Sequence, residues 1–164
     1  MALEVVDIAE MKISDSPEDV LVTYSLGSCV GVAIYDPVLG IGGMIHCMLP
    51  LSKVNTAKAQ EKPGMFVDTG LSLLLTRLFN LGMRKSRAII MVAGGAHVLN
   101  NNSLFKIGER NVTVLRKILW KNGLLMHVKD LGGNTSRTIR LHMDSRHFVI
   151  KKQGQEYCYD LTAS

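Results

Sequence analysis

The hydrophobic pattern of this chain begins with short apolar runs separated by polar and turn-forming residues. Strands in globular proteins are typically about four to eight residues long and rich in β-branched side chains, as these runs are. The first third of the chain therefore predicts strands over Val5–Ile13, Val20–Ser25, Val30–Tyr35 and Ile41–Met48.

The last two of these runs are joined by a segment, Asp36–Gly40, that contains a proline and a glycine and predicts a turn. We therefore expect Val30–Tyr35 and Ile41–Met48 to pair as an antiparallel hairpin. Such a hairpin brings the end of its second strand beside the beginning of its first. Cys29 and His46 are then expected to be neighbours.

Helical periodicity appears next. Leucines at positions 71, 74, 75 and 78, followed by Phe79, recur with the spacing of one helix face and predict an amphipathic helix over Val67–Leu81. Asp68 is its expected N-cap and Gly82 its expected end. A second helix is predicted over Asn111–Asn122.

Two connecting segments are candidates for recognition. Leu51–Gly64 is rich in lysine, glutamine and glutamate and predicts a long exposed loop, which is either a lid over the functional site or a plain connector. Apolar residues Leu104, Phe105 and Ile107 fall in a second connection, where they either pack on the core or anchor a partner. The sequence leaves both alternatives open.

The remaining strands settle the expected fold class. Strands are predicted over Ala88–Ala93 and Leu124–Val128, and a C-terminal hairpin over Arg137–Met143 and His147–Lys151. Strands at both ends of the chain with two helices between them indicate an α+β layered domain rather than a doubly wound parallel sheet.

Composition fits one folded domain over residues 1–164. Apolar residues make up 47% of the 164-residue chain and charged residues 20%, a globular balance. The net charge of +5 comes from scattered residues, with only short pairs such as Arg84-Lys85, and aromatics make up 5%. No nucleic-acid partner is therefore expected; a mildly positive surface favours an acidic protein partner.

The cysteines and the N-terminus predict a cytoplasmic protein. Cys29, Cys47 and Cys158 are odd in number and form no C-x-x-C pair, so no disulfide framework is expected. No signal peptide or membrane-length apolar span is visible, so no membrane insertion is expected. His97 with His46 and Cys47 does not have the spacing of a zinc site, so we expect neither a metal nor a cofactor.

Cys29 is the candidate nucleophile and His46 the candidate base. A free thiol with a pKa near about 8.5 is weakly nucleophilic at neutral pH, and an adjacent imidazole activates it by taking its proton and pairing with the thiolate. Small residues before a nucleophile, here Gly27 and Ser28, let substrate approach backbone N–H groups. The alternative is that both side chains are structural, because cysteine is most often a buried small hydrophobe.

Glycines also end the strand predicted over Ala88–Ala93. Gly94 and Gly95 lack the spacing of a phosphate-binding loop, and close approach of their backbone to the functional site or to a neighbouring strand fits better. We include them with Gly27 and Ser28 as expected substrate-binding residues.

Five sequence blocks carry a resemblance to a known family. They are Thr-Tyr-Ser-Leu-Gly-Ser-Cys-Val at 23–30, Gly-Gly-Met-Ile-His-Cys-Met-Leu-Pro at 42–50, Gly-Gly-Ala at 94–96, Ile-Gly-Glu-Arg-Asn at 107–111 and Gly-Gly-Asn-Thr-Ser-Arg at 132–137. In this order they resemble the CheD family, the chemoreceptor glutamine deamidases of bacterial and archaeal chemotaxis. The resemblance extends through nearly the whole chain.

The resemblance implies a fold and a reaction. The fold would be a β-sandwich flanked by helices, related to the deamidating toxins. Cys29 would be the nucleophile, His46 the general base and Thr23 the residue that holds the imidazole, in an amidohydrolase that converts receptor glutamine to glutamate and ammonia. The substrate would be the helical cytoplasmic bundle of a chemoreceptor.

Two other functions remain open. One is an interaction module that binds the chemotaxis phosphatase CheC, as members of the family can, with weak or no catalysis. The other is a cysteine amidohydrolase or transferase that acts on small amides, which turnover of free glutamine would reveal.

Overall fold

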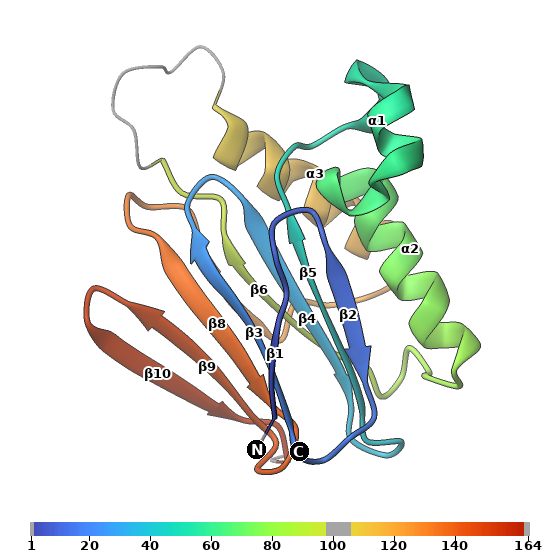
Figure 1. Cartoon of the computed structure of the whole chain (residues 1–164), viewed down its shortest axis with the longest axis vertical. Helices are drawn as coiled ribbons and strands as arrows, with labels where there is room; N and C mark the ends of the chain where they lie inside the picture. Colours follow the sequence, from blue (N-terminus) through green and yellow to red (C-terminus); the bar gives the residue numbers. More distant parts are fainter. Residues whose placement is uncertain (1, 98–105, 163–164) are drawn as a thin grey trace.

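The computed structural model describes residues 2–97 and 106–162 (Figure 1). Its strands are β1 (Ala2–Val5), β2 (Met11–Ser14), β3 (Asp19–Leu26), β4 (Val30–Asp36), β5 (Ile41–Cys47), β6 (Ile89–Gly94), β7 (Val128–Leu131), β8 (Arg137–His142), β9 (His147–Lys152) and β10 (Gln155–Asp160). Its helices are α1 (Thr56–Glu61), α2 (Val67–Asn80) and α3 (Ile107–Lys121), with 3₁₀ turns η1 (Ser52–Val54) and η2 (Pro63–Met65).

The strands form two sheets that pack face to face. The first sheet has the order β1-β3-β8-β9-β10 and the second the order β2-β5-β4-β6-β7. Apolar side chains from both sheets meet in one buried cluster, which we call the inter-sheet core. It includes Leu21, Leu26, Ala33, Met44, Ile139 and Phe148. The expected α+β sandwich is confirmed.

The two main helices cover the other face of the second sheet (Figure 1). The side chains buried there, which we call the helix-side core, include Val32, Ile45, Cys47, Leu71, Leu74 and Leu115. Because successive strand residues point to opposite faces, β4 and β5 contribute alternate side chains to the two cores. The second sheet is thus buried on both faces.

The hairpin of β4 and β5 forms as predicted. Its register pairs Val30 with Cys47 and Gly31 with His46. On its other edge β4 pairs with β6, where Val30 lies opposite Gly94. The residue before β4 therefore lies between the ends of two neighbouring strands.

The predicted single strand over Val5–Ile13 is wrong. β1 pairs in parallel with β3 in the first sheet, whereas β2 pairs antiparallel with β5 in the second. The segment 6–10 crosses between the sheets, with Ala9 in the left-handed region at φ 68°. The reason is long-range: each half of the apolar run gains backbone hydrogen bonds at the free edge of a different sheet.

Helix α2 agrees with its prediction at the C-terminal end but not in its N-cap. It ends beside Gly82, whose φ is +105°. Its N-cap residue is Phe66, without a side-chain hydrogen bond, and not Asp68. Asp68 lies in the first turn, where its carboxylate accepts from the backbone N–H and hydroxyl of Ser52. A carboxylate there also interacts favourably with the helix dipole.

The segment predicted as a long loop is largely exposed, as expected, but it is helical. Residues 52–65 form η1, α1 and η2. Asn55 caps α1 by accepting from the N–H of Lys58. The polar composition that predicted a loop is equally compatible with short exposed helices.

Two further boundaries differ from the predictions, and one strand was not predicted. Helix α3 begins at Ile107 rather than Asn111, and β7 begins at Val128, where the predicted strand over Leu124–Val128 ends. The C-terminal hairpin is confirmed, but a third strand, β10, follows it. All six residues of β10 are exposed, so it lacks the apolar alternation that marks a strand. Leu104 and Phe105 lie outside the described residues.

Candidate active site

Thr23 and His46 meet between the two sheets. Thr23 lies on β3 and is fully buried, while His46 lies on β5 and is 1% exposed. The Thr23 hydroxyl oxygen is 2.7 Å from Nδ1 of His46. Gly31, opposite His46, allows the sheets to approach, because a Cβ there would lie 2.8 Å from a Leu26 methyl carbon. The sandwich therefore joins two residues from different sheets.

A second hydrogen bond fixes the tautomer of His46. The Thr23 hydroxyl donates its single proton to the carbonyl oxygen of Val6 at 2.7 Å. A carbonyl can only accept, so the hydroxyl has no second proton for the imidazole. Nδ1 of His46 must then donate to Thr23. In the neutral ring, Nε2 carries the lone pair and is the basic atom.

Nε2 of His46 is buried and has no hydrogen-bond partner among the residues that the structure describes. Burial lowers the pKa of His46 from 6.5 to about 4, an effect that the Asp7 carboxylate partly opposes. The imidazole is therefore neutral at neutral pH. A neutral imidazole with an unpaired Nε2 is able to accept a proton.

The segment after β1 makes two backbone hydrogen bonds to His46. The N–H of Ala9 donates to the His46 carbonyl at 2.8 Å, and the His46 N–H donates to the Glu10 carbonyl at 3.1 Å. The same segment supplies the Val6 carbonyl that binds Thr23. One crossing of the chain thus orients both residues.

Cys29 lies on the same side of the second sheet as His46. It is half-buried and packs against the inter-sheet core. It precedes Gly31 by two residues, and Gly31 is the pairing partner of His46. Residues two apart in a strand share a face, and diagonal neighbours across a strand pair are within reach of long side chains. The hairpin therefore places the thiol on the face of the sheet that carries the imidazole, and their action as nucleophile and base stays a prediction.

The surroundings of Cys29 do not produce a thiolate in the resting protein. Burial raises the pKa of the thiol, and its own backbone N–H opposes this only in part. Because burial also keeps His46 neutral, the resting pair is a neutral thiol and a neutral imidazole. The expected activation through a preformed thiolate–imidazolium pair is thus not what this environment favours.

The other two cysteines lie elsewhere. Cys47 is fully buried in the helix-side core, on the opposite face of the second sheet, and burial raises the pKa of its thiol strongly. Cys158 is exposed on β10. All three cysteines are free thiols.

The paired glycines hold the backbone at Cys29. The N–H of Gly95 donates to the Cys29 carbonyl at 2.8 Å, and the N–H of Ala96 donates to the Gly27 carbonyl at the same distance. A Cβ at Gly94 would overlap the Cys29 carbonyl oxygen. Gly94 and Gly95 therefore fit the predicted close approach to the site. Their role in substrate binding, like that of Gly27 and Ser28, stays a prediction.

Sequence reasoning missed one buried polar residue at this site. Asn111 on α3 is fully buried, and its Nδ2 donates to the carbonyls of Ser28 at 2.9 Å and Met48 at 3.0 Å. These carbonyls flank Cys29 and the end of β5. The available signal was a small polar residue within the 107–111 block, inside the apolar pattern of a helix.

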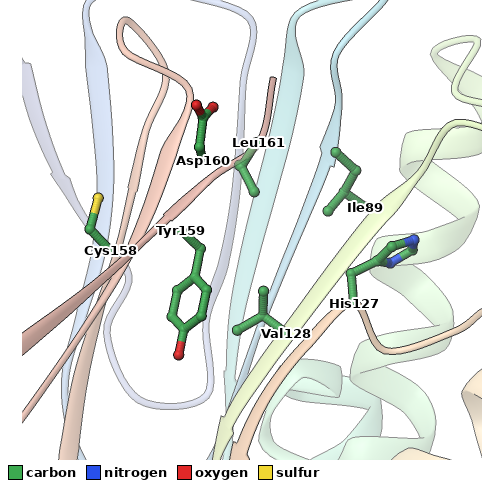
Figure 2. A pocket seen from close by; sticks show the side chains of 7 residues that line it. All are labelled: Ile89, His127, Val128, Cys158, Tyr159, Asp160 and Leu161. Atoms are coloured by element: carbon green, nitrogen blue, oxygen red, sulfur yellow. The ribbon is translucent and has the colours of Figure 1, made fainter. Parts of the chain in front are cut away.

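A pocket of about 410 Å³ lies away from these residues (Figure 2). One side is formed by Ile89, His127 and Val128, and the other by residues 158–161 at the end of β10. The Tyr159 ring extends to the same end of the pocket as Val128, whereas the Asp160 carboxylate points the other way (Figure 2). None of the candidate catalytic residues lines it.

The described part of the chain comprises residues 2–97 and 106–162. Within this part of the chain no group of three or more His, Cys, Asp or Glu side chains could hold a metal ion. No helix there has the length and apolar character needed to span a membrane.

Comparison with known proteins gives a consistent family. The CheD family model, described as CheD chemotactic sensory transduction, matches residues 48–152. A protein of Syntrophus aciditrophicus named probable chemoreceptor glutamine deamidase CheD 1 is 43% identical over 150 residues, covering 92% of this chain and 94% of that protein.

Other similar proteins have the same kind of name. A probable chemoreceptor glutamine deamidase CheD of Solibacter usitatus is 43% identical, covering 93% of this chain and 90% of that protein. One of Methanococcus maripaludis is 36% identical, covering 92% of this chain and 95% of that protein. The family model begins after His46, whereas these longer alignments leave out too little of the chain to omit the segment 23–46.

Proposed function

The chain belongs to the CheD family, and from this membership we propose that it hydrolyses the side-chain amide of glutamine residues on chemoreceptors. The products are glutamate and ammonia, so the enzyme is a protein-glutamine glutaminase. The nucleophile is Cys29, the base is His46, and Thr23 orients the base.

The observation that carries this mechanism is the unpaired Nε2 of His46. The bond from Nδ1 to Thr23 makes Nε2 the basic atom, and Cys29 lies on the same face of the sheet. A histidine that only stabilised the core would be expected to use both ring nitrogens, because a buried polar atom without a partner costs about 1–3 kcal/mol. The lone pair on Nε2 of His46 is left free because it accepts the thiol proton of Cys29 during the reaction.

The first half-reaction starts from the neutral pair. As Cys29 Sγ bonds to the carboxamide carbon, the thiol proton passes to Nε2 of His46 and the amide oxygen becomes an oxyanion. The imidazolium then gives this proton to the leaving nitrogen, the C–N bond breaks, and ammonia departs. A thioester between Cys29 and the substrate remains.

Water completes the reaction. Nε2 of His46 takes a proton from the attacking water, and the second tetrahedral intermediate expels the thiolate, which recovers the proton. Thr23 accepts from Nδ1 in both protonation states of the ring, and the Asp7 carboxylate favours the transient imidazolium. The substrate changes from neutral to anionic, which alters the electrostatics of a receptor bundle.

The test uses a receptor cytoplasmic fragment. Incubation with the protein should release ammonia and convert defined glutamines to glutamate, detected by mass spectrometry of peptides. Cys29→Ala should prevent both while keeping the circular dichroism spectrum. Conversion by folded Cys29→Ala at the original rate would contradict the assignment, and turnover of free glutamine would instead favour an enzyme for small amides.

We further expect the protein to act in the cytoplasm, where the receptor bundle lies, and a CheC-type phosphatase remains a predicted partner. Full support of chemotaxis by Cys29→Ala would favour the interaction module over the enzyme. A variant that binds such a phosphatase but fails in chemotaxis would favour the enzyme.

A further inference from the structure

We propose that the backbone N–H groups of Ser28 and Cys29 form the oxyanion hole, and that Asn111 is the positioning residue that keeps the second of them in place. This inference rests on the proposed amide hydrolysis. It concerns which groups stabilise the charge that develops on the substrate oxygen.

We call Gly27–Cys29 the nucleophile segment, and all three of its carbonyl oxygens accept hydrogen bonds. Gly27 accepts from the N–H of Ala96, Ser28 from Nδ2 of Asn111, and Cys29 from the N–H of Gly95. Two of the donors, Gly95 and Ala96, directly follow β6, and the third, Asn111, lies on α3 and also binds the Met48 carbonyl after β5.

The planarity of the peptide unit relates the direction of each bound carbonyl to the direction of the N–H that follows it. Within one trans peptide unit, the C=O and the following N–H point in opposite directions. Binding of the Ser28 carbonyl by Asn111 therefore directs the Cys29 N–H away from α3. Binding of the Gly27 carbonyl by Ala96 does the same for the Ser28 N–H. Each of the two amides is thus directed away from the donor that binds the carbonyl of its own peptide unit.

Among the described residues, neither amide donates to another residue, and the Cys29 N–H is directed only at its own thiol. Both residues are half-buried, so a substrate can reach them. Adjacent backbone N–H groups without a protein acceptor are suited to bind an anion, as in a backbone nest. The anion expected beside a cysteine nucleophile is the tetrahedral oxyanion.

The side chain of Asn111 is suited to hold the Ser28 carbonyl in place. Its planar NH₂ group supplies two donors, one to Ser28 and one to Met48, which ties the nucleophile segment to the chain leaving β5. Its Oδ1 is buried without a partner among the described residues, so the side chain is retained for its donors. Helix α3 is fixed against the site at Gly108, where a Cβ would lie 2.6 Å from the carbonyl oxygens of Gly95 and Ala96.

The first experiment separates oxyanion stabilisation from placement of the sulfur. Asn111→Leu should lower kcat by about 10²-fold with KM within about 3-fold, since loss of one oxyanion donor typically costs about 10²–10³ in kcat. Alkylation of Cys29 by iodoacetamide creates no oxyanion and should change by less than about 3-fold. Asn111→Ser, which keeps one donor in a smaller side chain, should retain more activity and replaces the leucine variant if that does not fold.

The matched control is Asn122→Leu. Asn122 lies at the C-terminal end of the same helix, where its Nδ2 donates to the Ile118 carbonyl, and this change should leave kcat within about 3-fold. An unchanged kcat in a folded Asn111 variant would overturn the proposal. A parallel fall of kcat and of alkylation would also overturn it, because Asn111 would then place only the sulfur.

A second experiment uses the unaltered chain. Acetaldehyde should add to Cys29, forming a C–S bond while the thiol proton moves to the aldehyde oxygen. The amide protons of Ser28 and Cys29 should then move downfield in the NMR spectrum, more than that of Gly31. An adduct without these shifts refutes the oxyanion hole, whereas absence of ammonia release with the shifts present refutes only the proposed amide hydrolysis.

Discussion

His46 and Cys47 are adjacent in β5 but belong to opposite faces of the second sheet. The face of His46 is packed against the other sheet and contains a hydrogen-bonded imidazole, an unpaired nitrogen and a half-buried thiol. The face of Cys47 is packed against α2 and α3 by apolar side chains. The two faces of one sheet thus differ in character, with polar and titratable groups beside a half-buried thiol on one and an apolar core on the other.

Burial alone does not distinguish the candidate nucleophile from the thiol on the other face. Burial raises the pKa of both Cys29 and Cys47, so a low thiol pKa does not distinguish the candidate nucleophile. The difference is access to solvent and to a base: Cys29 is half-buried on the face of His46, whereas Cys47 is enclosed. Proton transfer to a positioned imidazole then replaces a preformed thiolate.

The largest expected effect comes from replacing Cys29 or Cys47 separately by alanine. Cys29→Ala should lower ammonia release by more than about 10⁴-fold, because the nucleophile is lost. Cys47→Ala should keep the rate within about 3-fold but lower the free energy of unfolding by about 1–2 kcal/mol, as expected for a small buried deletion. Steady-state kinetics and urea unfolding measure both. The reverse assignment of effects would refute the division between the faces.

Removal of the base should have the next largest effect. His46→Gln should lower kcat by about 10³-fold, since general base catalysis contributes typically about 10²–10⁴. His142→Gln, on the outward side of β8, should leave kcat within about 3-fold. An active, folded His46→Gln enzyme would remove His46 from the mechanism.

The buried imidazole should also make stability depend on pH. The pKa of His46 is lowered from 6.5 to about 4, so between these values the unfolded chain binds a proton that the folded chain does not. The free energy of unfolding keeps the full contribution of the neutral His46 above about pH 6.5. It falls by up to about 3 kcal/mol as the pH decreases toward 4. Urea unfolding across this range measures the change. His46→Gln should lose less stability over the same interval, and equal losses would contradict the assignment.

The smallest of these effects should come from the threonine that orients the base. Thr23→Val should lower kcat by about 10- to 100-fold, the usual cost of losing a residue that orients a functional histidine. It also leaves the Val6 carbonyl without its donor. Thr23→Ser retains the hydroxyl and should restore most of kcat. Equal rates in the valine and serine variants would show that the hydroxyl does not fix the tautomer.

Local features of the sequence were sufficient for part of the fold and the site. The turn at Asp36–Gly40 and the two apolar runs around it specify the β4–β5 hairpin, which places Cys29 just before β4 and His46 on the neighbouring strand β5. The leucine spacing likewise specifies α2. In both cases the interacting residues are close in sequence, so periodicity and turn residues contain the information.

Other features were accessible only through the resemblance or not at all. Thr23 was expected from the family blocks, since a β-branched residue in a strand has no distinguishing local pattern. Asn111 was read as the start of a helix, although it is the buried side chain that binds the nucleophile segment. The split of the predicted first strand into β1 and β2 depends on which sheet edges are free.

The sequence by itself therefore determined the β4–β5 hairpin, the two main helices α2 and α3, and the pair of residues that can carry thiol chemistry. Only the tertiary structure decided that His46 is neutral, which of its nitrogens is basic, and which carbonyls hold the nucleophile segment. The physical reason is that desolvation and hydrogen bonding at this site come from the packing of two sheets and a helix. Their residues are distant along the chain, and no local pattern encodes their contacts.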